Sequence, residues 1–312
     1  MARLTFTGGI HPYDGKELSK DKPIQEMLPK GDLVYPLSQH IGAPAKPIVS
    51  KGDRVLAGQK IGEAAGFVSA AVHASVSGTV KGIEPRRTVT GEQVMSIIVE
   101  NDGLYEDVGF YPVAPLEKLD KDEILQIIKD AGIVGMGGAG FPTHVKLSPR
   151  RPDKIQFVIV NCAECEPYLT SDYRRMKEEP ERVIGGLKIL LKLFDHAQGI
   201  LAVEDNKPDC IKLLRQLCRD EKRISVRALK TKYPQGAERQ LIYAVTGRKI
   251  NSSMLPADAG CIVNNVDTVV AVYRAVVEGR PLMERIVTVS GDAIENPRNF
   301  RGFLLTDVKV EP

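Results

Sequence analysis

Strands that are apolar on both faces alternate with amphipathic helices through the middle of the sequence, and this alternation restricts the possible folds more than any other feature. The apolar segments are "KIQFVIVN" (154–161), "GILAVED" (199–205) and "ISVRALK" (224–230). Helical periodicity flanks them and predicts helices at 120–131, 180–197, 208–219, 236–247 and 264–279. A strand that is apolar on both faces needs cover on both sides, which helices provide in a parallel sheet. Residues 113–283 are therefore predicted to form an α/β domain.

Residues 1–112 have a different character and predict an all-β domain. Short runs rich in Val and Ile, separated by Gly, Pro and Asp, indicate strands at 32–37, 46–50, 53–58, 59–64, 78–84 and 93–100. Through "GDRV", "GQKI" and "VSGTV", residues 49–84 resemble the biotinyl/lipoyl-like barrel-sandwich hybrid. Such domains attach a cofactor to a lysine, but residues 61–80 contain none, so a docking or structural module is expected. The last segment, 284–312, returns to β character and resembles the start of a β-grasp (SLBB-like) domain that the chain does not complete.

Composition and charge exclude several classes of function. The 312 residues include 43 Lys or Arg and 40 Asp or Glu, and a net charge of +3 without a run of like charges does not predict nucleic-acid binding. The N-terminal residues lack the apolar segment of a secretory signal. No apolar run reaches the roughly 20 residues that a membrane-spanning helix needs. Any membrane association is therefore expected to go through partner subunits.

A glycine-rich segment, "GIVGMGGAGFPTHVKL" (132–147), is the first candidate binding site. Gly135, Gly137 and Gly140 satisfy the G-x-G-x-x-G pattern, but a predicted helix precedes them where a dinucleotide fingerprint needs a strand. Consecutive glycines let backbone N–H groups face a ligand that a Cβ atom would obstruct, and a phosphate or a flat ring suits such a surface. Lys146 can add a positive charge. The alternative interpretation is a surface turn.

Two further segments carry candidate ligand-binding residues at the ends of predicted elements. "NCAECEPYLTSD" follows a strand, and if it is extended, Glu164 and Glu166 point the same way and suit sugar hydroxyls or the edge of a nicotinamide or flavin ring. Asn161 can donate and accept there. "NNVDT" (264–268) is predicted to open a helix, whose free N–H groups favour a phosphate. Taken alone, these segments are also consistent with an acidic loop and a helix cap.

The order of the three segments resembles the flavoprotein subunit of respiratory complex I. Longer motifs make the whole chain similar to a narrower family, the C subunits of Rnf ion-translocating electron-transport complexes. These motifs are "GGIHPYDGKELS" (8–19), "PLSQHIGAPAKPIV" (36–49), "AECEPYLTSDYRRM" (163–176), "YPQGAERQLIYAVTGR" (233–248) and "LPADAGCIVNNVDTV" (255–269).

The resemblance implies an FMN-binding module that exchanges electrons with NAD(H) and passes them singly to iron–sulfur carriers. Carried over by motif, the FMN-binding residues would be Gly135, Gly137, Gly138, Gly140, Lys146, Asn161, Tyr233, Gly236, Asn264, Asn265 and Thr268. The residues on the nicotinamide side would be Phe141, Glu164 and Glu166. No catalytic acid or base is expected, because the cofactor carries the chemistry.

Departures from the family pattern concern the nicotinamide and the iron–sulfur centres. The complex I flavoprotein has acidic residues at the positions of Ala163 and Ala237, and a lysine and a phenylalanine that grip NADH near Ser252 and Leu255. Flavin binding therefore has more support in the sequence than nicotinamide binding. The cysteine-rich segments that hold two [4Fe–4S] clusters in the full-length family have no counterpart, so no metal ligands are predicted in this chain.

The cysteines and histidines are interpreted mainly as structural. Cys162 and Cys165, with Cys261, could form a redox pair or part of a metal site, but no fourth ligand can be named, and packing beside the flavin is favoured. Cys210 and Cys218 occupy apolar positions of a helix and are predicted to be buried. The histidines are expected to be structural, with contact between His144 and a ligand phosphate as the alternative.

The resemblance to the C subunits of Rnf complexes implies an NADH-side electron-transfer subunit on the cytoplasmic side of a bacterial cell membrane, attached peripherally. Expected partners are the other subunits of an Rnf-type complex, NADH and, indirectly, a ferredoxin-type carrier. Two alternatives stay open. One is a soluble flavoprotein that feeds a substrate reductase, and the other is a non-catalytic docking subunit with a vestigial flavin site.

Overall fold

The chain folds into two compact units. The structure, a computed structural model, describes residues 4–88 and 91–303. The α/β unit comprises the chain up to Ile24 together with Leu147–Tyr273 and Thr288–Asn299. The barrel unit comprises Gln25–Lys146, Arg274–Val287 and the chain from Phe300 onward. The two units therefore interleave along the sequence, and the three consecutive domains of the sequence analysis stay a prediction.

The α/β unit is built on a four-stranded parallel sheet. Its order is β11 (Ile224–Leu229), β10 (Gln198–Glu204), β9 (Phe157–Cys162) and β12 (Cys261–Asn265), and every neighbouring pair is parallel. The three predicted apolar strands and the predicted parallel sheet are confirmed. Strand β12 was not predicted, because the sequence places Asn264 and Asn265 at the start of a helix. The structure instead ends β12 with these two residues, and helix α7 (Val266–Glu278) begins directly after them.

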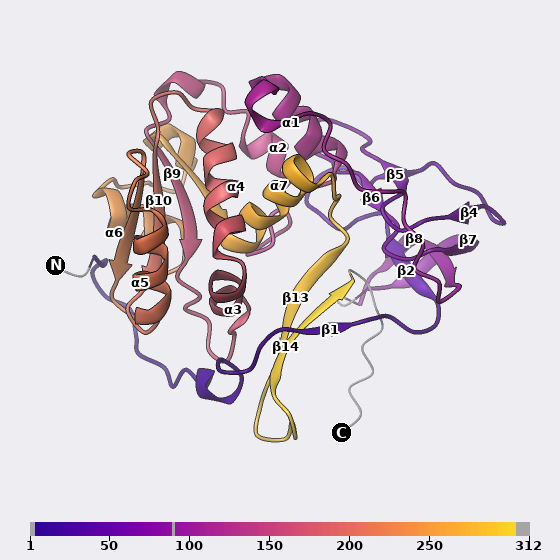
Figure 1. Cartoon of the computed structure of the whole chain (residues 1–312), viewed down its shortest axis with the longest axis horizontal. Helices are drawn as coiled ribbons and strands as arrows, with labels where there is room; N and C mark the ends of the chain where they lie inside the picture. The colour runs from indigo at the N-terminus through magenta and orange to yellow at the C-terminus, as the bar shows by residue number, and fades with distance from the viewer. Residues whose placement is uncertain (1–3, 89–90, 304–312) are drawn as a thin grey trace. The chain divides into compact units, whose positions relative to one another are not determined.

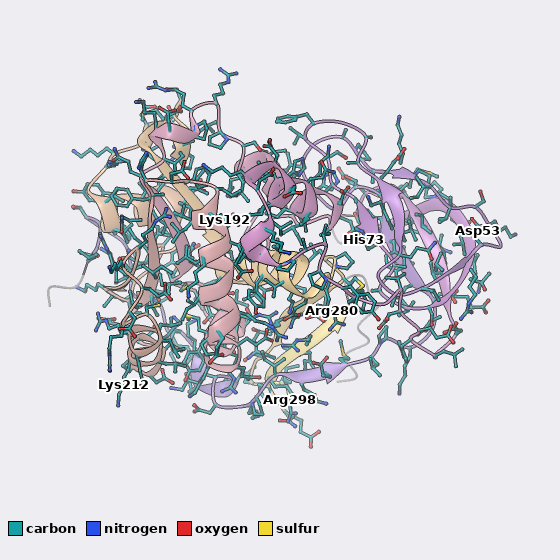
Figure 2. All side chains as sticks on the ribbon, turned by 45° about the horizontal axis from the view of Figure 1, so that its top comes forward. Asp53, His73, Lys192, Lys212, Arg280 and Arg298 are labelled. Carbon is teal, nitrogen blue, oxygen red and sulfur yellow. The ribbon has the colours of Figure 1, made fainter. Side chains whose placement is uncertain are left out.

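Helices cover both faces of this sheet, as Figure 1 shows for α6 and α4 on either side of β9 and β10. The helices are α3 (Ser171–Glu178), α4 (Pro180–Lys192), α5 (Pro208–Leu217), α6 (Glu238–Thr246) and α7. Helix α6 packs Leu241 and Ile242 into a core with Ile159 of β9. Cys210 and Cys218 are buried as predicted, whereas Lys212 of α5 points into solvent (Figure 2).

Helix α4 illustrates how the sequence determines local structure. Pro180 is its first residue, a position where the missing N–H costs nothing. The predicted buried face is confirmed, since Val183, Leu187, Leu190, Leu191 and Phe194 are all buried. The helix ends at Lys192, five residues before the predicted end at 197, and Phe194 remains buried beyond it. At Gly186 a Cβ atom would lie 2.2 Å from the carbonyl oxygen of Val269, so only glycine allows α7 this close.

The barrel unit contains two antiparallel sheets around one core. One sheet has the order β2 (Leu33–Pro36), β8 (Gln93–Asn101), β7 (Gly78–Arg87) and β4 (Arg54–Val55). The other has the order β3 (Lys46–Pro47), β5 (Lys60–Glu63) and β6 (Val72–His73). Each of the six predicted strand segments overlaps one of these strands, although β7 and β8 extend beyond the predicted ends at 84 and 100. Of the strands in these two sheets, β6 was not predicted. Figure 2 shows Asp53 in the turn before β4, where its carboxylate accepts a hydrogen bond from the N–H of Ser50 (2.8 Å).

Two helices and a small third sheet complete the description. Helix α1 (Lys121–Asp130) begins at a capping box formed by Asp120 and Glu123, and α2 (Thr143–Lys146) is a single turn. The third sheet has the order β1 (Gln25–Met27), β14 (Arg298–Phe303) and β13 (Glu284–Val289). The β character predicted from residue 284 is thus confirmed as far as residue 303, and residues 304–312 lie outside the described part. Short 3-10 turns occur at Lys16–Leu18, Leu116–Lys118, Pro152–Lys154 and Pro256–Ala259.

The first described residues of the chain belong to the α/β unit. Leu4 pairs in parallel with Leu229 at the edge of the sheet, and Ile10 exchanges two backbone hydrogen bonds of 2.9 Å with Tyr233. Among the described residues, no helix has the length and apolar character needed to cross a membrane.

Candidate functional site

Three of the predicted flavin-binding residues meet at one edge of the parallel sheet. Asn161 of β9 and Asn265 of β12 are register partners at the carboxyl ends of their strands. The side-chain amide of Asn161 donates to the carbonyl oxygen of Gly236 (2.8 Å) and its oxygen accepts from the N–H of Ala163 (3.2 Å). Gly236 fits because a Cβ atom there would lie 3.3 Å from the sulfur of Cys165. The carboxyl edge of a parallel sheet is a common ligand site.

The side chains at the start of α7 are less accessible to a ligand than the sequence predicts. Asn265 accepts from the N–H of Asp267 (2.8 Å) and donates to Asp172 (2.8 Å), so it caps the helix. Thr268 is also buried. Asn264 is buried too, and its amide nitrogen has no hydrogen-bond partner within the described chain. A buried donor without a partner is costly, and a bound ligand atom would remove that cost.

The two glutamates of residues 163–170, here called the acidic loop, do not point the same way, so that prediction is wrong. Glu164 has φ 51°, which breaks the extended backbone that the prediction assumed. Its buried carboxylate accepts from the N–H groups of Asp172 (2.7 Å) and Tyr173 (3.4 Å) and thereby caps α3. Burial raises the pKa of Glu164. Glu166 lies on the surface.

Residues 13–19, here called the N-terminal strap, hold the acidic loop in this shape. The buried ammonium of Lys16 donates to the carbonyl oxygens of Glu166 (3.0 Å) and Leu169 and lies 3.8 Å from the Glu164 carboxylate. The hydroxyls of Ser19 and Thr170 are 2.7 Å apart. The sequence analysis did not identify the strap as part of the site, although it lies within the quoted motif of residues 8–19.

Further buried charges lie behind the same edge. Lys207 donates to the carbonyl oxygen of Ala163 (2.7 Å) and lies 3.6 Å from the Glu204 carboxylate. Burial raises the pKa of Glu204 to about 7. Burial, together with the charges of Glu164 and Asp267, raises the pKa of Asp172 to about 8. Carboxyl groups held in a low dielectric in this way retain protons near neutral pH.

Cys162 and Cys165 lie beside this edge, and both are unpaired thiols. The sulfur of Cys165 accepts from the N–H of Gly236 (3.2 Å), and Cys162 is fully buried. Cys261 is also an unpaired, fully buried thiol, but it begins β12 opposite Phe157, at the amino end of the sheet. Burial raises the pKa of Cys162 well above its ordinary value, which suppresses thiolate chemistry. In the part of the chain that the structure describes, no three Cys, His, Asp or Glu side chains are grouped so as to hold a metal ion.

The glycine loop, residues 135–141 of the barrel unit, is closed at its base by backbone bonds. Val134 pairs with Pro142, and the N–H of Gly135 donates to the carbonyl oxygen of Phe141 (2.9 Å). Gly140 has φ 66°, and a Cβ atom on it would lie 3.1 Å from the carbonyl oxygen of Gln39. Helix α1 precedes the loop and only the single turn α2 follows, which confirms that the context differs from a dinucleotide fingerprint.

The tip of the glycine loop presents bare backbone to solvent. Residues 137–139 are exposed, and a Cβ atom on Gly138 would meet nothing within 4 Å. In residues 4–88 and 91–303, the amides of residues 137–139 donate no hydrogen bond. An exposed row of N–H groups without partners suits an anion or the polar edge of a ring. This observation fits the FMN predicted for the loop.

The side chains around the loop differ in accessibility. Phe141 and Lys146 are half-buried, whereas His144 is buried, with its Nε2 atom 3.3 Å from the carbonyl oxygen of Phe67. Burial lowers the pKa of His144, so its ring favours the neutral form. Arg285 of β13 donates to the carbonyl oxygen of Met136 in the loop, a contact that no local sequence pattern indicates.

The structure thus brings the predicted residues together in two groups. Asn161, Gly236 and Asn265 meet in the α/β unit, and the glycine loop and Lys146 lie together in the barrel unit. That both groups act on one ligand stays a prediction.

Comparisons with known proteins identify both parts of the chain. Residues 128–274 match the Nuo51 FMN-binding domain, and residues 4–104 match the RnfC barrel-sandwich hybrid domain. The C subunit of the Na⁺-translocating ferredoxin:NAD⁺ oxidoreductase complex of Acetobacterium woodii is 48% identical over 94% of this chain and 67% of its own length. The chain belongs to the RnfC family. The predicted resemblance, the predicted fold classes and an FMN-binding domain are thereby confirmed for this RnfC homologue.

Other members of the RnfC family are longer than this chain. The C subunit of the proton-translocating ferredoxin:NAD⁺ oxidoreductase complex of Clostridium ljungdahlii is 45% identical over 95% of the chain and 65% of its own length. The C subunit of the ion-translocating oxidoreductase complex of Pseudomonas aeruginosa is 42% identical, and the chain spans 39% of it. Among solved structures, an NAD⁺-reducing [NiFe]-hydrogenase in the H2-reduced state has a TM-score of 0.51 at 25% identity, covering 61% of this chain and 38% of that one.

Proposed function

We propose that this RnfC homologue binds FMN and passes electrons between NAD(H) and the iron–sulfur carriers of a membrane ion-translocating complex. The observation that carries the proposal is the closed glycine loop, whose exposed amides have no partner among the described residues. The match to an FMN-binding domain over residues 128–274 includes this loop and every other predicted ligand residue.

The proposed roles follow the chemistry of each group. FMN is held by the glycines at 135, 137, 138 and 140, by Lys146, and by Asn161, Tyr233, Gly236, Asn264, Asn265 and Thr268. Phe141 and the exposed Glu166 face the nicotinamide side, where a carboxylate accepts from sugar hydroxyls. Glu164 acts there through the shape of the acidic loop, because its carboxylate caps α3. When bound, FMN supplies the exchange between hydride and single-electron transfer, and the protein supplies orientation and excludes water.

The partners proposed are the other subunits of the complex, NAD(H) and, indirectly, a ferredoxin-type carrier. The complexes that contain the named relatives from Acetobacterium and Clostridium are ferredoxin:NAD⁺ oxidoreductases that translocate ions. A peripheral position on the cytoplasmic side of a bacterial cell membrane is part of the proposal. The [4Fe–4S] clusters that receive the electrons are expected to be held outside the residues of this chain.

A flavin titration followed by reduction tests the proposal. FMN is added to the protein while flavin fluorescence is followed, and NADH is then added without air. Quenching on binding and bleaching by NADH are the expected results. An absence of quenching rejects the FMN site and favours a non-catalytic docking subunit. Quenching without bleaching rejects the nicotinamide step. Copurification with membrane subunits distinguishes the proposal from a soluble flavoprotein that feeds a substrate reductase.

A further inference from the structure

Arg285 is an exposed cation fixed beside the glycine loop. It lies on β13, which begins at Glu284, and its guanidinium donates to the carbonyl oxygen of Met136. This contact joins residues that are 149 positions apart in the sequence. Because one hydrogen bond already restrains the long side chain, binding an anion beside the loop would cost less rotamer entropy than recruiting a free arginine.

Within residues 4–88 and 91–303, no carboxylate neutralises the charge of Arg285. The adjacent Glu284 lies on the other face of the strand, since successive side chains alternate. Glu284 pairs instead with Arg274 and lies 3.6 Å from Arg301. In the described part of the chain, Arg285 takes part in no ion pair within 4.0 Å, and its remaining N–H donors are available.

The neighbouring loop offers groups of matching chemistry. The amides of residues 137–139 are exposed and donate no hydrogen bond in the described chain. The buried ring of His144 favours its neutral form, which leaves positive charge to lysine and arginine side chains. A planar guanidinium beside a row of free backbone amides is an arrangement that binds phosphate oxygens by charge-assisted hydrogen bonds.

We infer that Arg285 binds a phosphate group presented to the glycine loop. The inference deepens the proposed function and rests on it, because it assigns to Arg285 the recognition of a phosphate of FMN or of the NAD(H) pyrophosphate. It adds a residue that lies outside the three motifs and outside residues 128–274.

The test compares ligands with and without phosphate. Affinities for FMN and for riboflavin are measured with the wild-type protein, Arg285→Gln and Arg285→Lys. Arg87→Gln is the matched control, because Arg87 is also an exposed arginine of the barrel unit that donates to a backbone carbonyl oxygen, that of Gly91 (3.4 Å). Unfolding midpoints of all variants establish that each is folded. On FMN-loaded protein, NADH is compared with the phosphate-free reduced nicotinamide riboside.

If the FMN phosphate is the ligand, Arg285→Gln weakens FMN binding about tenfold or more and leaves riboflavin unchanged, which is the scale of a charge-assisted hydrogen bond. If the dinucleotide phosphate is the ligand, FMN binding is kept and NADH alone is weakened. Arg285→Lys keeps part of the wild-type affinity in either case. Equal losses for the paired ligands, or behaviour identical to Arg87→Gln, overturn the inference while the proposed function stands. A wild-type protein that binds neither flavin overturns both.

Discussion

The side-chain amide of Asn265 donates a hydrogen bond to the carboxyl group of Asp172 over 2.8 Å. Asn265 ends strand β12, and Asp172 lies in the first turn of α3, so this bond ties the carboxyl edge of the sheet to a helix start. The bond also links a cap of α7 to a carboxyl group whose pKa is raised to about 8 by burial and by nearby carboxylates. The stability of the edge is therefore expected to depend on pH.

Asp172→Asn is expected to flatten the dependence of stability on pH. The pKa of Asp172 is raised from 3.8 to about 8, so between these values the unfolded chain releases a proton that the folded protein keeps. The free energy of unfolding therefore falls as pH rises through this window, by up to about 1.4 kcal/mol per pH unit. Asparagine cannot ionise and still accepts from Asn265. Urea unfolding at pH 5, 6.5 and 8 should show that the variant gains stability relative to wild type as the pH rises. Parallel plots of unfolding free energy against pH for the two proteins would contradict this account.

Lys16→Met is expected to loosen the acidic loop. The substitution removes the donor to the carbonyl oxygens of Glu166 and Leu169 and leaves the buried carboxylate of Glu164 without its cation. A loss of about 1–3 kcal/mol in unfolding free energy is expected for these orphaned groups. Limited proteolysis should show new cleavage within residues 163–170. The exposed Lys20→Met is the control and should leave both measurements unchanged; equal behaviour of the two variants would argue against the strap.

A pair of glycine variants separates backbone strain from ligand contact in the glycine loop. Gly140→Ala places a side chain at φ 66° and close to Gln39, so a loss of about 1–2 kcal/mol in stability is expected. Gly138→Ala meets open space, so its unfolding free energy should stay within about 0.5 kcal/mol of wild type. If the tip faces FMN, Gly138→Ala nevertheless weakens FMN binding in a fluorescence titration. Unchanged FMN affinity in this variant would place the flavin elsewhere.

Asn161→Asp is expected to damage the sheet edge despite its nearly identical shape. The amide nitrogen of Asn161 donates to the carbonyl oxygen of Gly236, and a carboxylate oxygen there would meet that oxygen without a proton. The expected cost is about 1–3 kcal/mol in the free energy of unfolding, together with weaker FMN binding. Asn251→Asp is the matched control, because the side-chain oxygen of Asn251 accepts from the N–H groups of Ser253 and Met254 and from the Ser253 hydroxyl, while its nitrogen donates to no group in the described residues. Unfolding curves that coincide for the two variants would contradict the role given to Asn161.

The sequence predicts those elements of the fold whose signal is local. Strands β9, β10 and β11 were predicted because each is a run of residues apolar on both faces. Strand β12 was missed because only three apolar residues precede Asn264 and Asn265, and the helical period of the following segment extends over them. Asn161 and Asn265 lie opposite each other because β9 and β12 pair in parallel. The sequence predicts the parallel sheet but not this particular pair of residues.

The parts of the site that the sequence does not reveal depend on distant contacts. The inward turn of Glu164 is set by Lys16, almost 150 residues earlier, and by the free N–H groups of α3. The contact of Arg285 with Met136 spans 149 residues and has no motif. Backbone preferences alone would leave Glu164 extended, and only the tertiary fold supplies the bonds that hold a non-glycine residue at a positive φ.

The pairing of Leu4 with Leu229 has a consequence for biosynthesis. Leu4 donates to Ala228 and accepts from Lys230, so the outer seam of the sheet cannot close until that distant stretch has left the ribosome. Leu4 is translated long before residues 228–230, so its pairing with them is expected to be among the last contacts to form. Late formation of such contacts is typical of folds with high contact order. An affinity tag fused ahead of Leu4 would therefore lie at this edge of the sheet. The same tag at the C-terminal end would leave the segment around Leu4 free to pair with β11.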